Sequence, residues 1–153
     1  MRRLYSLLLG VLAFAFLLRI VGQVLVAFFR ADFLPPMAEW YSGLIPYPLL
    51  LPIQLVILAI QARISWDIWR GSGFFSARRP RVGTLICWFS YVYFLAMVLR
   101  YVLTMYLYPE RRWLTGTIPI FFHWVLAAYL FVLGQCLRRA TSGDSPGPLT
   151  PQP

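Results

Sequence analysis

The stretch TIPIFFHWVLAAYLFVLGQ, residues 117–135, is apolar at almost every position and contains one histidine, His123. A helix rises about 1.5 Å per residue, so about 20 apolar residues are needed to cross the roughly 30 Å hydrocarbon core of a bilayer. The stretch has that length and therefore predicts a membrane-spanning helix. It also raises a question, because His123 is the only histidine in the chain and lies in the middle of this helix.

Three more apolar runs of similar length precede it, so that the predicted spans cover about 4–29, 46–69, 82–108 and 117–137. The chain of 153 residues is 60% hydrophobic and only 12% charged, a composition that ordinary soluble domains do not have. We therefore expect an all-α, polytopic integral membrane protein, with a four-helix bundle over residues 1–139. The polar, proline-rich segment 140–153 predicts a disordered tail.

The irregular segment 30–52, which links the first span to the first turns of the second, holds five of the twelve prolines. Pro36 is well placed to start a short helix, MAEWYSG, over residues 37–43. Trp40 and Tyr41 in this segment are residues that favour a membrane interface. The pattern predicts a short interfacial helix that lies on the non-cytoplasmic surface.

The net charge of +9 comes from arginines, because the chain has no lysine. Most of them flank the apolar runs, which favours a role in topology and contact with lipid headgroups over nucleic-acid binding. Eight arginines lie at the chain ends or between the second and third spans, against three in the other two connections. This bias predicts cytoplasmic termini, and the exclusive use of arginine suggests a bacterial inner-membrane protein from a GC-rich genome.

One polar residue in each predicted span falls at a similar depth. Counted from the cytoplasmic helix ends, Arg19 lies at about 18 Å, Gln54 at about 22 Å, Arg100 at about 24 Å and His123 at about 21 Å. An unpaired guanidinium in hydrocarbon costs at least about 2.5 kcal/mol. The two arginines therefore need a partner.

Two interpretations of this layer remain open. In the first, Arg19 and Arg100 pair with Glu39 or Glu110 of the outer connections, or reach the headgroups, while the other polar residues bond across helices. In the second, the layer is a ligand site that suits a lipid phosphate, a fatty carboxylate or a quinone head. Its residues would be Arg19, Gln54, Tyr93, Arg100 and His123.

A third interpretation is a haem or a chlorophyll held by His123, with Met97 at a similar depth. Proton or ion transfer is disfavoured, because the one acid deep in a span, Asp67, can pair with Arg63 four residues earlier. No spacing indicates a catalytic centre or a metal-ligand cluster, so enzymatic activity stays uncertain and is not favoured. Cys87 and Cys136 are expected to be buried thiols.

These observations favour a small integral membrane protein without an evident catalytic centre, acting as an accessory or assembly subunit of a larger membrane complex. Its expected contacts are membrane lipids and either a membrane protein partner or further copies of itself, with no nucleic acid. The alternative is a lipid-, quinone- or pigment-binding protein that uses the Arg, Gln and His layer. In that case a bound lipid or quinone is expected ahead of a haem or chlorophyll.

Overall fold

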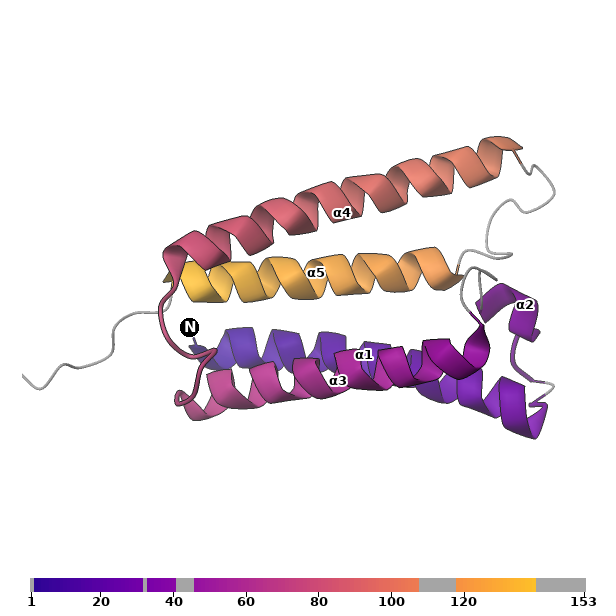
Figure 1. Cartoon of the computed structure of the whole chain (residues 1–153), viewed down its shortest axis with the longest axis horizontal. Helices are drawn as coiled ribbons and strands as arrows, with labels where there is room; N and C mark the ends of the chain where they lie inside the picture. Colours follow the sequence, from indigo (N-terminus) through magenta and orange to yellow (C-terminus); the bar gives the residue numbers. More distant parts are fainter. Residues whose placement is uncertain (1, 32, 41–45, 108–117, 140–153) are drawn as a thin grey trace, which may run out of the picture.

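The computed structural model describes residues 2–31, 33–40, 46–107 and 118–139, and in these ranges the regular structure is entirely helical. The helices are α1 (Arg2–Phe29), α2 (Met37–Trp40), α3 (Tyr47–Arg70), α4 (Pro80–Leu107) and α5 (Ile118–Arg139), as Figure 1 shows. Four of the described helices, α1, α3, α4 and α5, are long and apolar enough to cross a membrane. The four expected long helices are thus confirmed, with ends within two residues of the predicted ones.

Local sequence explains where these helices begin and end. Pro46 and Pro48 lie at the start of α3, where a backbone N–H has no partner within the helix. The same helix ends at Gly71, which has φ of 73° and donates its backbone N–H to the carbonyl of Asp67 at 2.9 Å. Glycine adopts this left-handed conformation without steric cost, so it turns the chain towards α4.

Helices α1, α3 and α5 pack around one apolar core. The Ser6 hydroxyl donates to the carbonyl of Ser65 at 3.2 Å, and the Tyr129 hydroxyl donates to the carbonyl of Gln61 at 2.9 Å. These bonds tie α1 and α5 to α3. The buried members of the core are Leu9, Ala13, Ile64, Ile68, Tyr129, Leu133, Cys136 and Leu137.

Helix α4 departs from the expected closed bundle, because among the described elements it packs against α5 alone. Near the start of α4 the two helices touch through glycines: a Cβ on Gly83 would lie 2.7 Å from the carbonyl oxygen of Gly134. Towards its C-terminal end α4 diverges from α5 (Figure 1), where aromatic side chains such as Tyr93, Phe94 and Tyr101 lie between the helices. Small residues at one end and large ones at the other account for this divergence.

Helix α2 covers the end of the molecule opposite the N-terminus, here called the α2 end (Figure 1). The ring of Trp40 packs against Gly22, its indole N–H donates to the carbonyl of Pro35 at 2.9 Å, and Gln23 donates its amide to the Trp40 carbonyl at 2.8 Å. Trp40 is therefore buried against α1. A short helix is present as expected, its interfacial position stays a prediction, and residues 41–43 lie outside the described ranges, as does the predicted tail.

Candidate functional site

His123 on α5 faces Tyr93 on α4. The Tyr93 hydroxyl lies 2.5 Å from Nδ1 of His123, and the two rings meet edge to face with centroids 5.8 Å apart. Both side chains are half-buried. The lone histidine is thus half of a hydrogen-bonded pair that joins α4 to α5, in the part of the molecule where the helices begin to separate.

Arg19 approaches the same region from α1. Its guanidinium carbon lies 5.3 Å from the ring centroid of Phe122, the residue before His123, which is a cation–π contact. The side chain is only 8% exposed, and its Nε has no hydrogen-bond partner among the described residues. A buried guanidinium with an unused donor is unusual, because a buried polar group without a hydrogen-bond partner is costly.

Arg100 supplies a second positive charge, two helical turns after Tyr93 on α4. The seven-residue spacing places Arg100 and Tyr93 on the same face of α4. Within the described ranges, neither arginine forms an ion pair with a carboxylate. Glu39 is half-buried on α2, and Glu110 lies outside the described ranges.

The described residues contain one ion pair, which joins Arg63 Nε and Asp67 Oδ1 at 3.2 Å. It links two positions four residues apart on α3, as the sequence predicted. Asp67 is therefore engaged near the end of the molecule opposite α2. It does not balance the charge of Arg19 or Arg100.

Gln54 is buried on α3, and neither atom of its side-chain amide has a described partner. The same is true of Gln61, two turns further along the same face. No described hydrogen bond or ring contact joins Gln54 to Tyr93, His123 or either arginine. The structure joins Tyr93 to His123 and places Arg19 against Phe122 beside them, while Arg100 shares a face of α4 with Tyr93 without a described contact to the other three. We call Arg19, Tyr93, Arg100 and His123, four of the five predicted ligand residues, the arginine layer.

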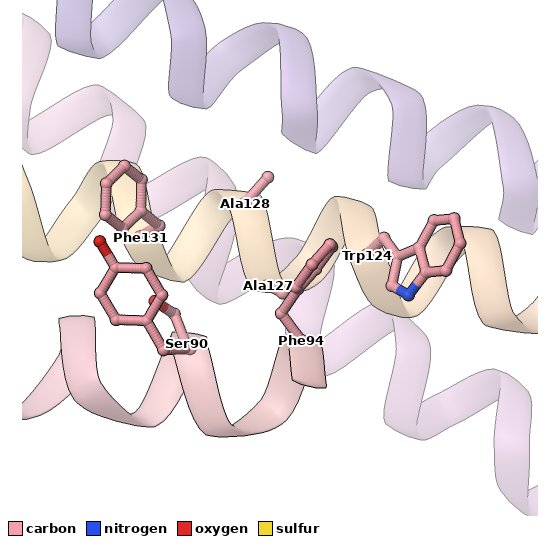
Figure 2. A pocket seen from close by; sticks show the side chains of 7 residues that line it. Ser90, Phe94, Trp124, Ala127, Ala128 and Phe131 are labelled. Carbon is pink, nitrogen blue, oxygen red and sulfur yellow. The ribbon is translucent and has the colours of Figure 1, made fainter. Parts of the chain in front are cut away.

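An apolar groove of about 200 Å³ lies between α4 and α5 next to this layer (Figure 2). Trp124, which follows His123, stands at one end of it, and its indole nitrogen is buried without a described partner. Trp124 also contacts Phe94 and Tyr101 of α4, with ring centroids 5.8 Å apart in both pairs. The lining residues are Ser90, Tyr91, Phe94, Trp124, Ala127, Ala128 and Phe131.

Sequence reasoning did not assign a role to Phe122 or anticipate the groove. Phe122 could not be singled out, because one phenylalanine in an apolar helix resembles the others until a cation is placed against it.

Met97, the other residue considered for a haem, is half-buried on α4 between Tyr93 and Arg100. The bond to Tyr93 engages Nδ1 of His123 and leaves Nε2 as the ring atom that could bind a metal. No group of three or more His, Cys, Asp or Glu side chains that could hold a metal ion occurs in the ranges that the structure describes.

Comparisons with protein-family models, with curated proteins and with solved structures find no match to this chain.

Proposed function

We propose that this protein binds the anionic or carbonyl-bearing head of a membrane amphiphile at the arginine layer. One observation carries the proposal: beside the Tyr93–His123 pair, Arg19 packs on Phe122 and Arg100 lies on the Tyr93 face of α4, and no described carboxylate is paired with either arginine. A ligand with negative charge or exposed oxygen atoms would supply acceptors that the described residues do not offer to these arginines.

The chemistry of the four side chains suits such a head. A guanidinium offers several N–H donors in a planar fork that matches carboxylate and phosphate oxygens. The tyrosine hydroxyl and the imidazole can each donate or accept, so they can adjust to a phosphate, a carboxylate or a quinone carbonyl. Because the region is partly buried, these charge-assisted bonds are screened less than they would be in water.

The proposal includes a placement in the cell. Four helices long enough to span a bilayer, together with the arginine bias, support a bacterial inner-membrane protein with both termini in the cytoplasm. In this orientation α2 lies at the outer surface as an interfacial helix. The arginine layer then falls in the outer half of the membrane.

The test is to purify the protein in a mild detergent and to identify bound molecules by native mass spectrometry and solvent extraction. The informative variant is Arg19→Gln with Arg100→Gln, and the matched control is Arg78→Gln, an exposed arginine between α3 and α4. We expect the wild type and the control to carry a defined amphiphile. The double variant should bind this amphiphile about tenfold more weakly, which corresponds to a loss of ~1.4 kcal/mol in binding free energy.

The result that would overturn the proposal is an unchanged amphiphile content in a double variant that elutes as a single folded species. An absorption spectrum of the same sample tests the pigment alternative, in which His123 would hold a haem or chlorophyll. A porphyrin-type absorption band that disappears in His123→Ala would identify the ligand as a pigment and not as an amphiphile.

A second candidate function is that of an accessory or assembly subunit, and the isolation of α4 favours it. This helix packs on α5 alone among the described helices and exposes large side chains such as Trp88, Leu95 and Leu99. A larger membrane protein, or another copy of this chain, could pack on that face. The test is to transfer the protein into nanodiscs without detergent exchange and to look for a stoichiometric partner. A partner that is lost in the double variant Trp88→Ala with Leu95→Ala would support an accessory role. A protein that is recovered as a lone monomer would contradict it.

A further inference from the structure

The end of the molecule opposite α2 is strongly basic. Here α1 begins, α3 is joined to α4, and α5 ends (Figure 1). Arginines lie at the start of α1, at the end of α3, in the connection to α4 and in the last turn of α5. The described acid at this end, Asp67, is already paired with Arg63. The remaining arginines therefore form a positive surface that no described carboxylate neutralises.

Two of these arginines are held over aromatic rings. The guanidinium carbon of Arg79 lies 3.6 Å from the ring centroid of Phe74, and that of Arg70 lies 4.5 Å from the ring centroid of Trp66. Both rings belong to exposed residues, Phe74 at 62% and Trp66 at 44%. These cation–π contacts fix where the two charges lie on the surface. We call Arg70 and Arg79 the ring-packed arginines.

The backbone of the connection supports this arrangement at Arg79. Its N–H donates to the carbonyl of Leu137 at 3.0 Å, which ties the start of α4 to the end of α5. On α3, the ring of Trp66 packs in turn against that of Trp69, with centroids 5.2 Å apart. Each ring-packed arginine is thus placed by a contact to its ring and by the structure around it.

The N–H donors of the ring-packed arginines are left for another partner. A cation–π contact acts through the charge and the ring quadrupole, and it uses no oxygen acceptor. No described hydrogen bond or ion pair involves the side chain of either residue. A guanidinium presents its donors in a planar fork that matches phosphate oxygens, and a side chain that is already ordered loses less entropy on binding. Each of the two can therefore receive an anion.

The position of the two arginines indicates which anion this is. Arg70 is the last residue of α3 and Arg79 immediately precedes α4, and both helices are long and apolar enough to cross a membrane. Trp66 and Trp69 lie in the last turn and a half of α3 and are both exposed. Tryptophan beside arginine at the end of a span is typical of the headgroup region of a bilayer. The anion that lies at this level is a lipid phosphate.

We propose that the ring-packed arginines each bind the phosphate of an anionic phospholipid in the leaflet at this end of the molecule. Charge complementarity selects an anionic lipid over a zwitterionic one, because the cationic group of a zwitterionic headgroup is repelled by the surrounding arginines. This binding is separate from the proposed function, since it shares no residue with the arginine layer.

The experiment measures lipid binding to the full-length protein by native mass spectrometry. Delipidated protein is titrated with phosphatidylglycerol or with phosphatidylcholine, and the apparent affinity for each lipid is obtained. Arg70→Gln with Arg79→Gln removes the ring-packed arginines. Arg78→Gln with Arg81→Gln is the control with the same change in charge, because both residues are exposed and no described ring contact involves them.

A third variant, Trp66→Leu with Phe74→Leu, removes the rings and keeps every charge. We expect the wild type to bind phosphatidylglycerol at least about fivefold more tightly than phosphatidylcholine, and loss of the ring-packed arginines to remove this preference. The ring variant should bind phosphatidylglycerol about two- to fivefold more weakly. The control should lose less than about twofold, because exposed charges away from the bound phosphate are screened.

Equal losses in the two charge-matched variants would overturn the inference, because they would show a general attraction without a site. An unchanged affinity in the ring variant would overturn it as well. Hexaglutamate and inorganic phosphate are added as competitors, and displacement of phosphatidylglycerol by either at equal charge concentration would assign the surface to an acidic peptide or a free anion. Should the double variant fail to fold, the single variants Arg70→Gln and Arg78→Gln, both at exposed positions, give the same comparison.

Discussion

Gly134 illustrates how much one missing methyl group matters in this protein. A Cβ at this position would lie 2.6 Å from the Cys87 sulfur and 2.8 Å from the carbonyl oxygen of Gly83, and that backbone oxygen cannot easily move away. The close approach of α4 and α5 therefore requires glycine on both sides. Small residues serve membrane helices in this way because contact between backbones replaces the hydrophobic effect as the source of attraction.

We predict that Gly134→Ala destabilises the protein by about 1–3 kcal/mol, the range for overpacking a tight contact. Gly10→Ala is the matched control, because a Cβ on Gly10 meets nothing within 4 Å and alanine favours a helix by up to about 1 kcal/mol. The measurement is the midpoint of thermal unfolding in detergent. A midpoint that falls equally in both variants would contradict the contact.

The hydrogen bond between Tyr93 and His123 is the second contact whose contribution can be tested with a single substitution. Removing the hydroxyl with Tyr93→Phe should cost about 0.6 kcal/mol, the mean for hydrogen bonds between membrane helices. Tyr91→Phe is the control, since Tyr91 is 56% exposed and no described hydrogen bond involves its hydroxyl. Reversible unfolding in mixed micelles measures both, and an equal loss in the two variants would show that the bond contributes nothing specific.

At the scale of elements, α2 is held in place by a few named contacts. Gln23 reaches it from α1 and bonds the carbonyl of Trp40, whose ring in turn packs against Gly22. We predict that Gln23→Leu breaks this link and increases amide hydrogen exchange over residues 37–40, while the four long helices keep their protection.

Gln135→Leu serves as the control for that experiment. Gln135 is a half-buried glutamine on α5, far along the helix from α2, and its side chain has no described hydrogen bond. It should leave the exchange of residues 37–40 unchanged. Equal exchange in wild type and Gln23→Leu would mean that the tryptophan ring alone holds α2.

The existence and length of the long helices could be predicted from the sequence, because a bilayer demands about 20 apolar residues for each crossing. The packing of α4 could not. Lipid tails and protein neighbours are equally apolar, so the Leu-, Val- and Phe-rich faces of α4 do not reveal which of them meets another helix. Gly83 and Gly134 were the informative residues, yet their pairing across helices depends on a register that one sequence does not show.

The candidate site was predicted in part for a similar reason. Depth along a helix follows from the residue count, and this is why Arg19, Arg100 and His123 could be assigned to one layer before their helices were arranged. The direction in which each side chain points around the bundle does not follow from that count. Gln54 lies at a comparable depth on the inward face of α3, but no described contact connects it to the other members.

At the scale of the whole molecule, the orientation in the membrane can be tested with single cysteines. In a background with Cys87→Ser and Cys136→Ser, Ser72→Cys lies between α3 and α4, and Phe33→Cys lies between α1 and α2 at a position that is 82% exposed. We predict that a membrane-impermeant maleimide applied to spheroplasts labels Phe33→Cys and spares Ser72→Cys until the cells are lysed. Labelling of Ser72→Cys in intact spheroplasts, with Phe33→Cys labelled only after lysis, would show that the topology is the opposite of the proposed one.

The central place of α5 constrains how the chain can be assembled during synthesis. Among the described helices it is the last to leave the ribosome, yet it contacts α1 on one side and α4 on the other. Until α5 has packed between them, Arg19 has no Phe122 ring beside it and Tyr93 has no histidine partner. A chain without α5 therefore leaves Arg19 without its cation–π contact and α4 without the helix against which it packs.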